Sequence, residues 1–344
     1  MDGTPLADGL RMPAEWSPHE RTLIAWPARR ALWGDRYDEA CAVHAQVARV
    51  VLASEPVTVV AAPDDEAAAR LACGPGVDVV AIPIDDSWAR DSGPIGVVGP
   101  GGRRAVVDFV FNGWGEKFAP WDRDDDLAAR LAEYLDLPRY RAPFVLEGGA
   151  IAVDGDGTLI ATEQCLLHPN RNPGLTRAEI ETGLQRYLGV ERVVWIPFGL
   201  ADDDDTDGHV DNVACFVAPG VVLVQGCDDP SRPDHERLVI NRRCLDGARD
   251  ASGRAIEVVE VPVLPLVGTG RGQRAVPYLN YYVANRTVVV PVAGHRSDQR
   301  ILDLISSFYP GREVVAVPGA ALAHGGGGVH CITQQVPSSR LTDA

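Results

Sequence analysis

The sequence predicts an α/β protein in which one arrangement of strands and helices is repeated along the chain. Short β-branched runs alternate with stretches whose apolar residues return at helical spacing. The helical stretches begin near residues 64, 123, 176, 234 and 297, at intervals of 53 to 63 residues. Such spacing indicates an internal repeat and fits a closed ring of about five ββα-type units, with an irregular α/β protein as the alternative.

The predicted strands are short and are bounded by turn residues. Single β-branched runs cover 57–62, 77–83, 193–197, 256–263 and 313–318. Paired runs flank short turns within 148–162, 211–225 and 278–292, and we expect hairpins there.

The predicted helices lie between these strands, over 36–54, 64–73, 123–135, 176–188, 234–248 and 297–309. The clearest helix start is Thr176, because Glu179 three residues later completes a candidate capping box. No linker rich in Pro, Gly or Ser divides the chain, and we therefore expect a single domain over residues 1–344.

The chain is acidic, with 48 Asp and Glu against 32 Lys and Arg and a formal net charge of −16. Because phosphates are held mainly by clustered Lys and Arg, this balance argues against nucleic acid or a membrane as a partner and suits a cationic substrate. None of the seven cysteines forms a C-x-x-C pair, and neither a signal peptide nor 18 consecutive apolar residues is found. We expect a cytoplasmic protein with reduced thiols.

Polar residues follow the predicted strands at corresponding places in the repeat, namely Asp91, Glu147, His209, Asn280 and Cys331. Equivalent loops of a ring converge on its axis, so these residues are expected to share one central site. His209 is a candidate general acid or base because flanking aspartates can orient its ring or raise its pKa, and a solvated turn is the alternative.

Cys331 is the most informative thiol, since it follows the glycines at 325–328, which can approach a ligand closely and move as a lid. A buried structural cysteine is the alternative, and it fits Cys165, Cys215 and Cys244, which lie within apolar periodicity.

Metal sites are disfavoured. A calcium loop that starts at Asp203 places Ala214 where a bidentate Glu is required. A zinc site from His324, His330 and Cys331 lacks a second cysteine and a defined spacing. Three tryptophans in polar, glycine-containing segments are candidates for stacking on a planar cation or for partial burial in the core: Trp88, Trp114 and Trp121.

Several long motifs occur in a specific order. They are MPAEWSPHERT, WARDSGP, FNGWGEKF, LEGGAI, TEQCLLHPNRNP, DDDTDGHVDNVACFV, YLNYYVAN and GGGGVHCITQQ. In these motifs the chain resembles the family of agmatine deiminases and bacterial peptidylarginine deiminases, within the guanidino-group-modifying superfamily. The resemblance covers nearly the whole chain and implies a pseudo-symmetric five-bladed α/β propeller of ββαβ units.

The resemblance also implies roles for individual residues. Cys331 matches the nucleophile, His209 the general acid and base, and Glu147 the carboxylate that acts beside it. Asp91 and Asp211 match the pair that grips the guanidinium nitrogens. Trp88 falls in the substrate-lining segment.

The implied reaction is hydrolysis of agmatine to N-carbamoylputrescine and ammonia through a cysteine thiouronium adduct, with no metal or organic cofactor. Another guanidino substrate such as an arginine derivative, an amidinotransferase, and a catalytically silent binding protein are the alternatives. Residues 28–40 depart from the best-known agmatine deiminases, which bears on substrate identity. We expect the acidic run Asp202–Asp205 to face the pocket and to select a second positive charge on the substrate. A homo-oligomer is possible.

Overall fold

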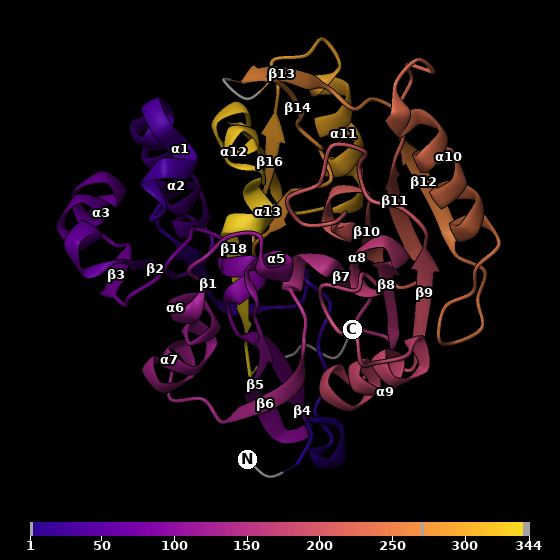
Figure 1. Cartoon of the computed structure of the whole chain (residues 1–344), viewed down its shortest axis with the longest axis horizontal. Coiled ribbons are helices and arrows are strands. Elements are labelled where there is room, and N and C mark those ends of the chain that lie inside the picture. Colours follow the sequence, from indigo (N-terminus) through magenta and orange to yellow (C-terminus); the bar gives the residue numbers. More distant parts are fainter. Residues whose placement is uncertain (1–2, 270–271, 340–344) are drawn as a thin grey trace.

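The computed structural model describes residues 3–269 and 272–339 and has a mixed α/β fold with several small sheets (Figure 1). Among the described residues, four sheets have three strands each: β4 (Ile95–Gly99), β5 (Arg103–Val110) and β6 (Arg139–Val145); β7 (Ile151–Val153), β8 (Thr158–Thr162) and β9 (Arg192–Ile196); β10 (Ala214–Ala218), β11 (Val221–Gln225) and β12 (Glu257–Val261); and β15 (Tyr282–Val283), β16 (Thr287–Val292) and β17 (Glu313–Pro318).

One pairing pattern recurs in all four of these sheets. The middle strand pairs antiparallel with the strand before it and parallel with the strand after it. A parallel pair needs a crossover connection, and a helix supplies it in each sheet. The α/β fold class predicted from the sequence is therefore confirmed.

The fifth sheet joins the two ends of the chain. Its order is β18 (Thr333–Pro337), β1 (His19–Ala25), β2 (Val57–Ala61) and β3 (Asp78–Ala81). β18 runs antiparallel to β1, with Ile24 opposite Thr333. A separate hairpin consists of β13 (Leu266–Thr269) and β14 (Gly272–Ala275).

The longer helices agree with the predicted ranges to within two residues, apart from an interruption between α6 and α7. They are α2 (Tyr37–Leu52), α3 (Glu66–Cys73), α6 (Asp122–Asp125), α7 (Leu127–Tyr134), α9 (Arg177–Leu188), α10 (Pro233–Asp246) and α11 (Asp298–Phe308). The capping box is confirmed, because Thr176 Oγ1 accepts from the Glu179 backbone and the Glu179 carboxylate accepts from the Thr176 backbone. Figure 1 places α3, α7, α9 and α10 at the rim of the molecule.

The remaining helical elements are short. They are α1 (Arg30–Trp33), α4 (Ala89–Ser92), α5 (Gly113–Glu116), α8 (Glu163–Leu166), α12 (Ala320–Gly325), α13 (Val329–Ile332), and the 3-10 turns η1 (Leu6–Asp8), η2 (Gly34–Arg36), η3 (Pro63–Asp65), η4 (Pro100–Gly102), η5 (Gly148–Ala150) and η6 (Val210–Asn212). Four of them, α4, η5, η6 and α13, consist entirely of buried residues.

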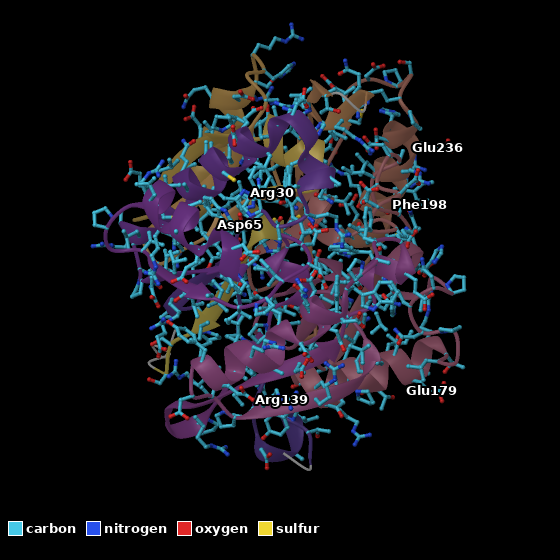
Figure 2. All side chains as sticks on the ribbon, turned by 60° about the vertical axis from the view of Figure 1, so that its left-hand side comes forward. Arg30, Asp65, Arg139, Glu179, Phe198 and Glu236 are labelled. Atoms are coloured by element: carbon cyan, nitrogen blue, oxygen red, sulfur yellow. The ribbon has the colours of Figure 1, made fainter. Side chains whose placement is uncertain are left out.

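Apolar side chains of the sheets and of the inner helix faces form the core, while charged side chains such as Glu179 and Glu236 lie at the surface (Figure 2). Cys165 is buried, as predicted, and Cys215 is partly buried. The prediction for Cys244 was wrong, because it lies exposed on α10, where apolar periodicity alone does not identify the buried face. None of the described helices is long and apolar enough to cross a membrane.

Candidate active site

Four of the five polar residues predicted to share a site lie on or directly before the buried short turns, with Asp91 on α4, Glu147 before η5, His209 before η6, and Cys331 on α13. These turns pack against one another, α4 against both α13 and η5, and η5 against η6. Each turn is too short to form a stable helix alone, so the surrounding sheets hold the site in place. The site is therefore assembled from segments that are far apart in the sequence.

Cys331 is surrounded by polar groups. Its thiol is oriented to donate to Asp211 Oδ2 at 3.5 Å, and Asn280 Nδ2 donates to the sulfur at 3.2 Å. Asn280 Nδ2 also donates to Asn212 Oδ1 at 2.9 Å. Cys331 is only 6% exposed, and its thiol has fixed polar partners.

Asp91 lies against the backbone of Gly149. Its Oδ1 accepts from the Gly149 amide at 3.0 Å and its Oδ2 from Trp114 Nε1 at 3.0 Å. A Cβ atom on Gly149 would lie 2.8 Å from Asp91 Oδ1 and 3.1 Å from Asp211 Oδ2, so these two oxygens are within about 6 Å of each other. Both carboxylates can therefore reach one planar cation, as the sequence-based hypothesis requires.

His209 is oriented by a carboxylate that is distant in the sequence. Its Nδ1 lies 3.8 Å from Asp91 Oδ1, whereas the neighbouring Asp207 forms ion pairs with Lys117 and Arg171. The Asp203 carboxylate accepts from the His209 backbone amide at 3.2 Å and holds the loop. The carboxylate beside the His209 ring is therefore that of Asp91 and not that of its sequence neighbour Asp207.

Glu147 is completely buried and is bound by Arg171, a residue that the sequence analysis missed. Arg171 Nε donates to Glu147 Oε1 at 2.6 Å, and neither side chain is exposed. Glu147 Oε2 has no hydrogen-bond partner among the described residues. Arg171 lies within the motif TEQCLLHPNRNP, so its place in a long matching segment was the available signal.

Glu147, Cys165 and His209 have donor atoms within 4.8 Å of one another, the one grouping of this kind in the described part of the chain. An arginine already occupies one oxygen of Glu147, and burial raises the pKa of the Cys165 thiol. Because a thiol must ionise to bind a metal, this set fits hydrogen bonding better than metal coordination. His324, His330 and Cys331, the zinc alternative, do not form such a group in the described chain.

The titratable groups influence one another strongly. Burial, Asp211 and Asp91 together raise the pKa of the Cys331 thiol well above its ordinary value. Burial is also the main reason that the pKa of Asp91 rises to about 6. For His209, burial disfavours the charged ring, but Asp91, Cys165 and Glu147 outweigh it and raise its pKa well above 6.5. His209 is thus able to hold a proton at neutral pH.

A pocket opens on one side of Cys331 and contains about 340 Å³ of space between atoms. Its lining combines aromatic, acidic and glycine residues, including Trp88, Trp114, Asp91, Asp205 and Gly327. A Cβ on Gly327 would lie 2.4 Å from the Trp88 ring, so this glycine permits close approach of the loop to the ring. Trp121 does not line the pocket and packs against Gly113 instead.

The four residues of the acidic run Asp202–Asp205 lie in different environments. Asp205 lines the pocket. Asp203 accepts from Thr206 and His209 within its own loop, Asp204 is exposed, and the Asp202 carbonyl accepts from Arg274. The expectation that the run faces the pocket therefore applies to one of its four residues.

Several solved structures named as deiminases share this fold. The agmatine deiminase of Enterococcus faecalis superposes with a TM-score of 0.95 at 34% sequence identity and covers 99% of both chains. Agmatine deiminases of Stutzerimonas stutzeri and Pseudomonas aeruginosa are 41% and 43% identical, each over 98% of both chains. The sequence model of the Porphyromonas-type peptidyl-arginine deiminase family matches residues 11–337. The chain belongs to this family.

Proposed function

We propose that this protein is an enzyme that hydrolyses agmatine to N-carbamoylputrescine and ammonia through a covalent adduct on Cys331. The observation that carries the proposal is the arrangement of the Cys331 thiol beside Asp211, with Asp91, Asp211 and His209 gathered at Gly149. The full-length similarity to agmatine deiminases supports the choice of substrate.

Substrate binding uses the two aspartates. A guanidinium is planar and carries N–H donors on each edge, and paired carboxylates bind it with charge-assisted hydrogen bonds. Asp91 and Asp211 hold these edges, and Trp88 lines the pocket. The added cation also offsets the carboxylates that raise the pKa of Cys331, so the thiol ionises more readily beside its substrate.

The first half-reaction forms the adduct. The Cys331 thiolate adds to the guanidinium carbon and forms a C–S bond. His209 then donates a proton to a terminal nitrogen, the C–N bond breaks, and ammonia leaves. The remaining adduct is a thiouronium on Cys331.

The second half-reaction removes the adduct with water. Neutral His209, with Glu147 beside it, accepts a proton from water, and the oxygen adds to the same carbon. The C–S bond then breaks and returns the thiolate, and the product carries the new oxygen as a urea group. One water is consumed and one ammonia is released, so no redox partner or cofactor is needed.

Selection of agmatine over arginine is assigned to Asp205. Agmatine ends in an ammonium, whereas arginine adds a carboxylate that an acidic pocket wall would repel. Asp205 borders the pocket beside Gly326 and Thr206, and its carboxylate is available for the far end of a substrate. Asp204, exposed and outside the pocket lining, is the matched control residue.

The test is ammonia release from agmatine, arginine, guanidinobutyrate and a peptidyl arginine. We expect kcat/KM to be highest for agmatine, and Asp205→Asn to raise KM for agmatine while Asp204→Asn leaves it unchanged. Equal or greater kcat/KM for arginine would contradict the substrate assignment. No ammonia from any of the four compounds would contradict the enzyme assignment.

We further propose that the repeated sheets form a pseudo-symmetric five-bladed α/β propeller, one catalytic domain over residues 1–344. The five sheets with antiparallel and parallel pairing and the insertion of β18 beside β1 support this arrangement. The cytoplasmic location, the absence of nucleic-acid and membrane partners, and the possible homo-oligomer remain predictions from the sequence.

A further inference from the structure

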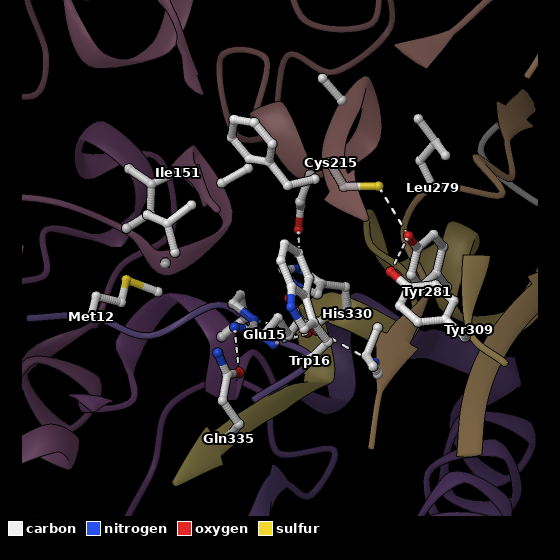
Figure 3. Close-up of a pocket in the computed structure, with 18 residues that line it drawn as sticks. Met12, Glu15, Trp16, Ile151, Cys215, Leu279, Tyr281, Tyr309, His330 and Gln335 are labelled. Atoms are coloured by element: carbon white, nitrogen blue, oxygen red, sulfur yellow. Dashed lines mark hydrogen bonds and ion pairs between the residues drawn. The ribbon is translucent and has the colours of Figure 1, made fainter. Parts of the chain in front are cut away.

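A second cavity adjoins the site, with Asp211 but not Cys331 in its lining. It contains about 570 Å³ of space between atoms, and its lining includes Glu15, Arg90, Asp211 and His330 (Figure 3). Asp211 borders this cavity, and its Oδ2 lies 3.5 Å from the sulfur of Cys331, which borders the other. A lining residue of one cavity, Asp211, is therefore in contact with a lining residue of the other, Cys331.

His330 connects that carboxylate to Glu15. Its Nδ1 lies 2.9 Å from Asp211 Oδ2, and its Nε2 lies 2.9 Å from Glu15 Oε2. A neutral imidazole has only one N–H, so its other nitrogen would place a lone pair against a carboxylate oxygen. Two carboxylates at hydrogen-bond distance thus require an imidazolium or a protonated acid.

The electrostatic surroundings favour the imidazolium. His330 and Arg90 outweigh the effect of burial and lower the pKa of Glu15 to about 2, and His330 likewise lowers the pKa of Asp211. Burial and Arg90 oppose the charge on His330, but Glu15 and Asp211 outweigh them and raise its pKa above 6.5. The groups that face His330 are thus two carboxylates and one guanidinium.

The hydrogen-bonded series of Asp211, His330 and Glu15 becomes more exposed toward Glu15. The side chain of Asp211 is 3% exposed, that of His330 10%, and that of Glu15 24%. Arg90 also holds Glu15, with its Nη2 3.7 Å from Glu15 Oε1, and it donates to Gln334 and Gln335 of β18 at 2.8 Å each. Glu15 is therefore fixed in place although it lies outside the substrate pocket.

We propose that His330, held by Glu15, is a positioning residue. Its imidazolium keeps a positive charge beside the carboxylate of Asp211 and thereby sets the pH range in which the Cys331 thiol reacts. The inference rests on the proposed function, because it concerns the same thiol. The cation fixes one oxygen of Asp211 and partly cancels its charge beside the sulfur. Removal of that cation leaves the thiol beside uncompensated carboxylates, which disfavours the thiolate.

The test follows alkylation of Cys331 by iodoacetamide between pH 6 and 10, read by mass spectrometry of the peptide that contains it. This readout needs no substrate, so it fails independently of the agmatine assignment. His330→Asn keeps an amide donor near the Nδ1 position but removes the charge and the link to Glu15. We expect its profile to move to higher pH, with labelling at pH 8 slower by about tenfold for each unit of displacement.

Glu15→Gln tests the contact between His330 and Glu15. Cys215→Ala is the matched control, because Cys215 lines the same cavity. We expect the glutamine variant to move the profile in the same direction as His330→Asn, and the control to leave it unchanged. Circular dichroism and thermal midpoints verify that each variant is folded. A folded His330→Asn variant with an unchanged profile, or a Glu15→Gln profile that is unchanged or moves to lower pH, would overturn the proposal.

Discussion

At the residue scale, the thiol of Cys331 has a pKa that burial, Asp211 and Asp91 raise, and its reaction depends on the softness of sulfur. Cys331→Ser keeps the shape of the side chain but provides an alcohol, which is a much weaker nucleophile. We expect turnover to fall by several orders of magnitude with an unchanged thermal midpoint. Labelling of another cysteine by a haloacetamidine, or retained turnover in the serine variant, would remove Cys331 from the mechanism.

Arg171 is a second residue whose role can be measured. Arg171→Leu leaves Glu147 as a buried charge without its partner, which costs about 3 to 5 kcal/mol of unfolding free energy. Misplacement of Glu147 beside His209 is expected to lower kcat about 100-fold.

The control for this change is Arg177→Leu, which breaks the exposed pair with Glu163. Exposed pairs contribute about 0 to 1 kcal/mol, and Glu163 does not line the substrate pocket. Chemical denaturation and steady-state kinetics on both variants separate the two cases. Equal losses in the two variants would contradict a positioning role for Arg171.

The residues of the site differ in how readily the sequence identifies them. Cys331 follows a run of glycines and His209 is flanked by aspartates, and these local patterns pointed to them. Arg171 has no comparable local signal. Its burial depends on ion pairs with Glu147 and Asp207, which come from other segments of the chain. The partner of the His209 ring could not be predicted from its neighbours for the same reason, since Asp91 is 118 positions away.

At the element scale, the turn η5 packs its backbone closely against the reactive side chains. A methyl group on Gly149 would lie 2.6 Å from His209 Nδ1 and 2.8 Å from Asp91 Oδ1. We expect Gly149→Ala to lower kcat/KM for agmatine at least about 100-fold through displacement of these groups. Gly174→Ala is the matched control, because nothing lies within 4 Å of its added Cβ. Wild-type kinetics in Gly149→Ala would show that the packing around η5 is looser than described.

Elements with a strong local pattern were predicted well. The helix α9 has its capping box at Thr176 and ends at Leu188, as its sequence indicates. The pairing of β18 with β1 was not predicted, since about 310 residues separate Ile24 from Thr333 and neither strand specifies its partner locally.

At the scale of the whole molecule, ion pairs that are partly buried make stability depend on pH. The pKa of Glu15 is lowered from 4.5 to about 2, so its contribution is present above pH 4.5 and is lost as the pH falls toward 2. We expect the free energy of unfolding to decrease over that interval, and to decrease less in Glu15→Gln, which has no such proton to bind. Urea denaturation at pH 5, 4 and 3 measures this difference, and parallel curves for the two proteins would contradict it.

The α/β class and the repeat followed from periodicity, whereas the meeting of five loops at one point depended on how the sheets are placed. Periodicity reports which face of an element is buried. It does not report the distance between Asp91 and Asp211, which are 120 positions apart and reach the same glycine.

The position of Cys331 two residues before β18 has a consequence for synthesis of the protein. Domains begin to fold from the N-terminus while the chain is still being made. The sheet that contains β1, β2 and β3 therefore remains incomplete until β18 has been synthesised. Until residues 333–337 emerge and pair with β1, the thiol has been translated but has no fixed neighbours. Catalytic competence should therefore require synthesis of β18, and a stalled nascent chain that lacks this strand should consume no agmatine.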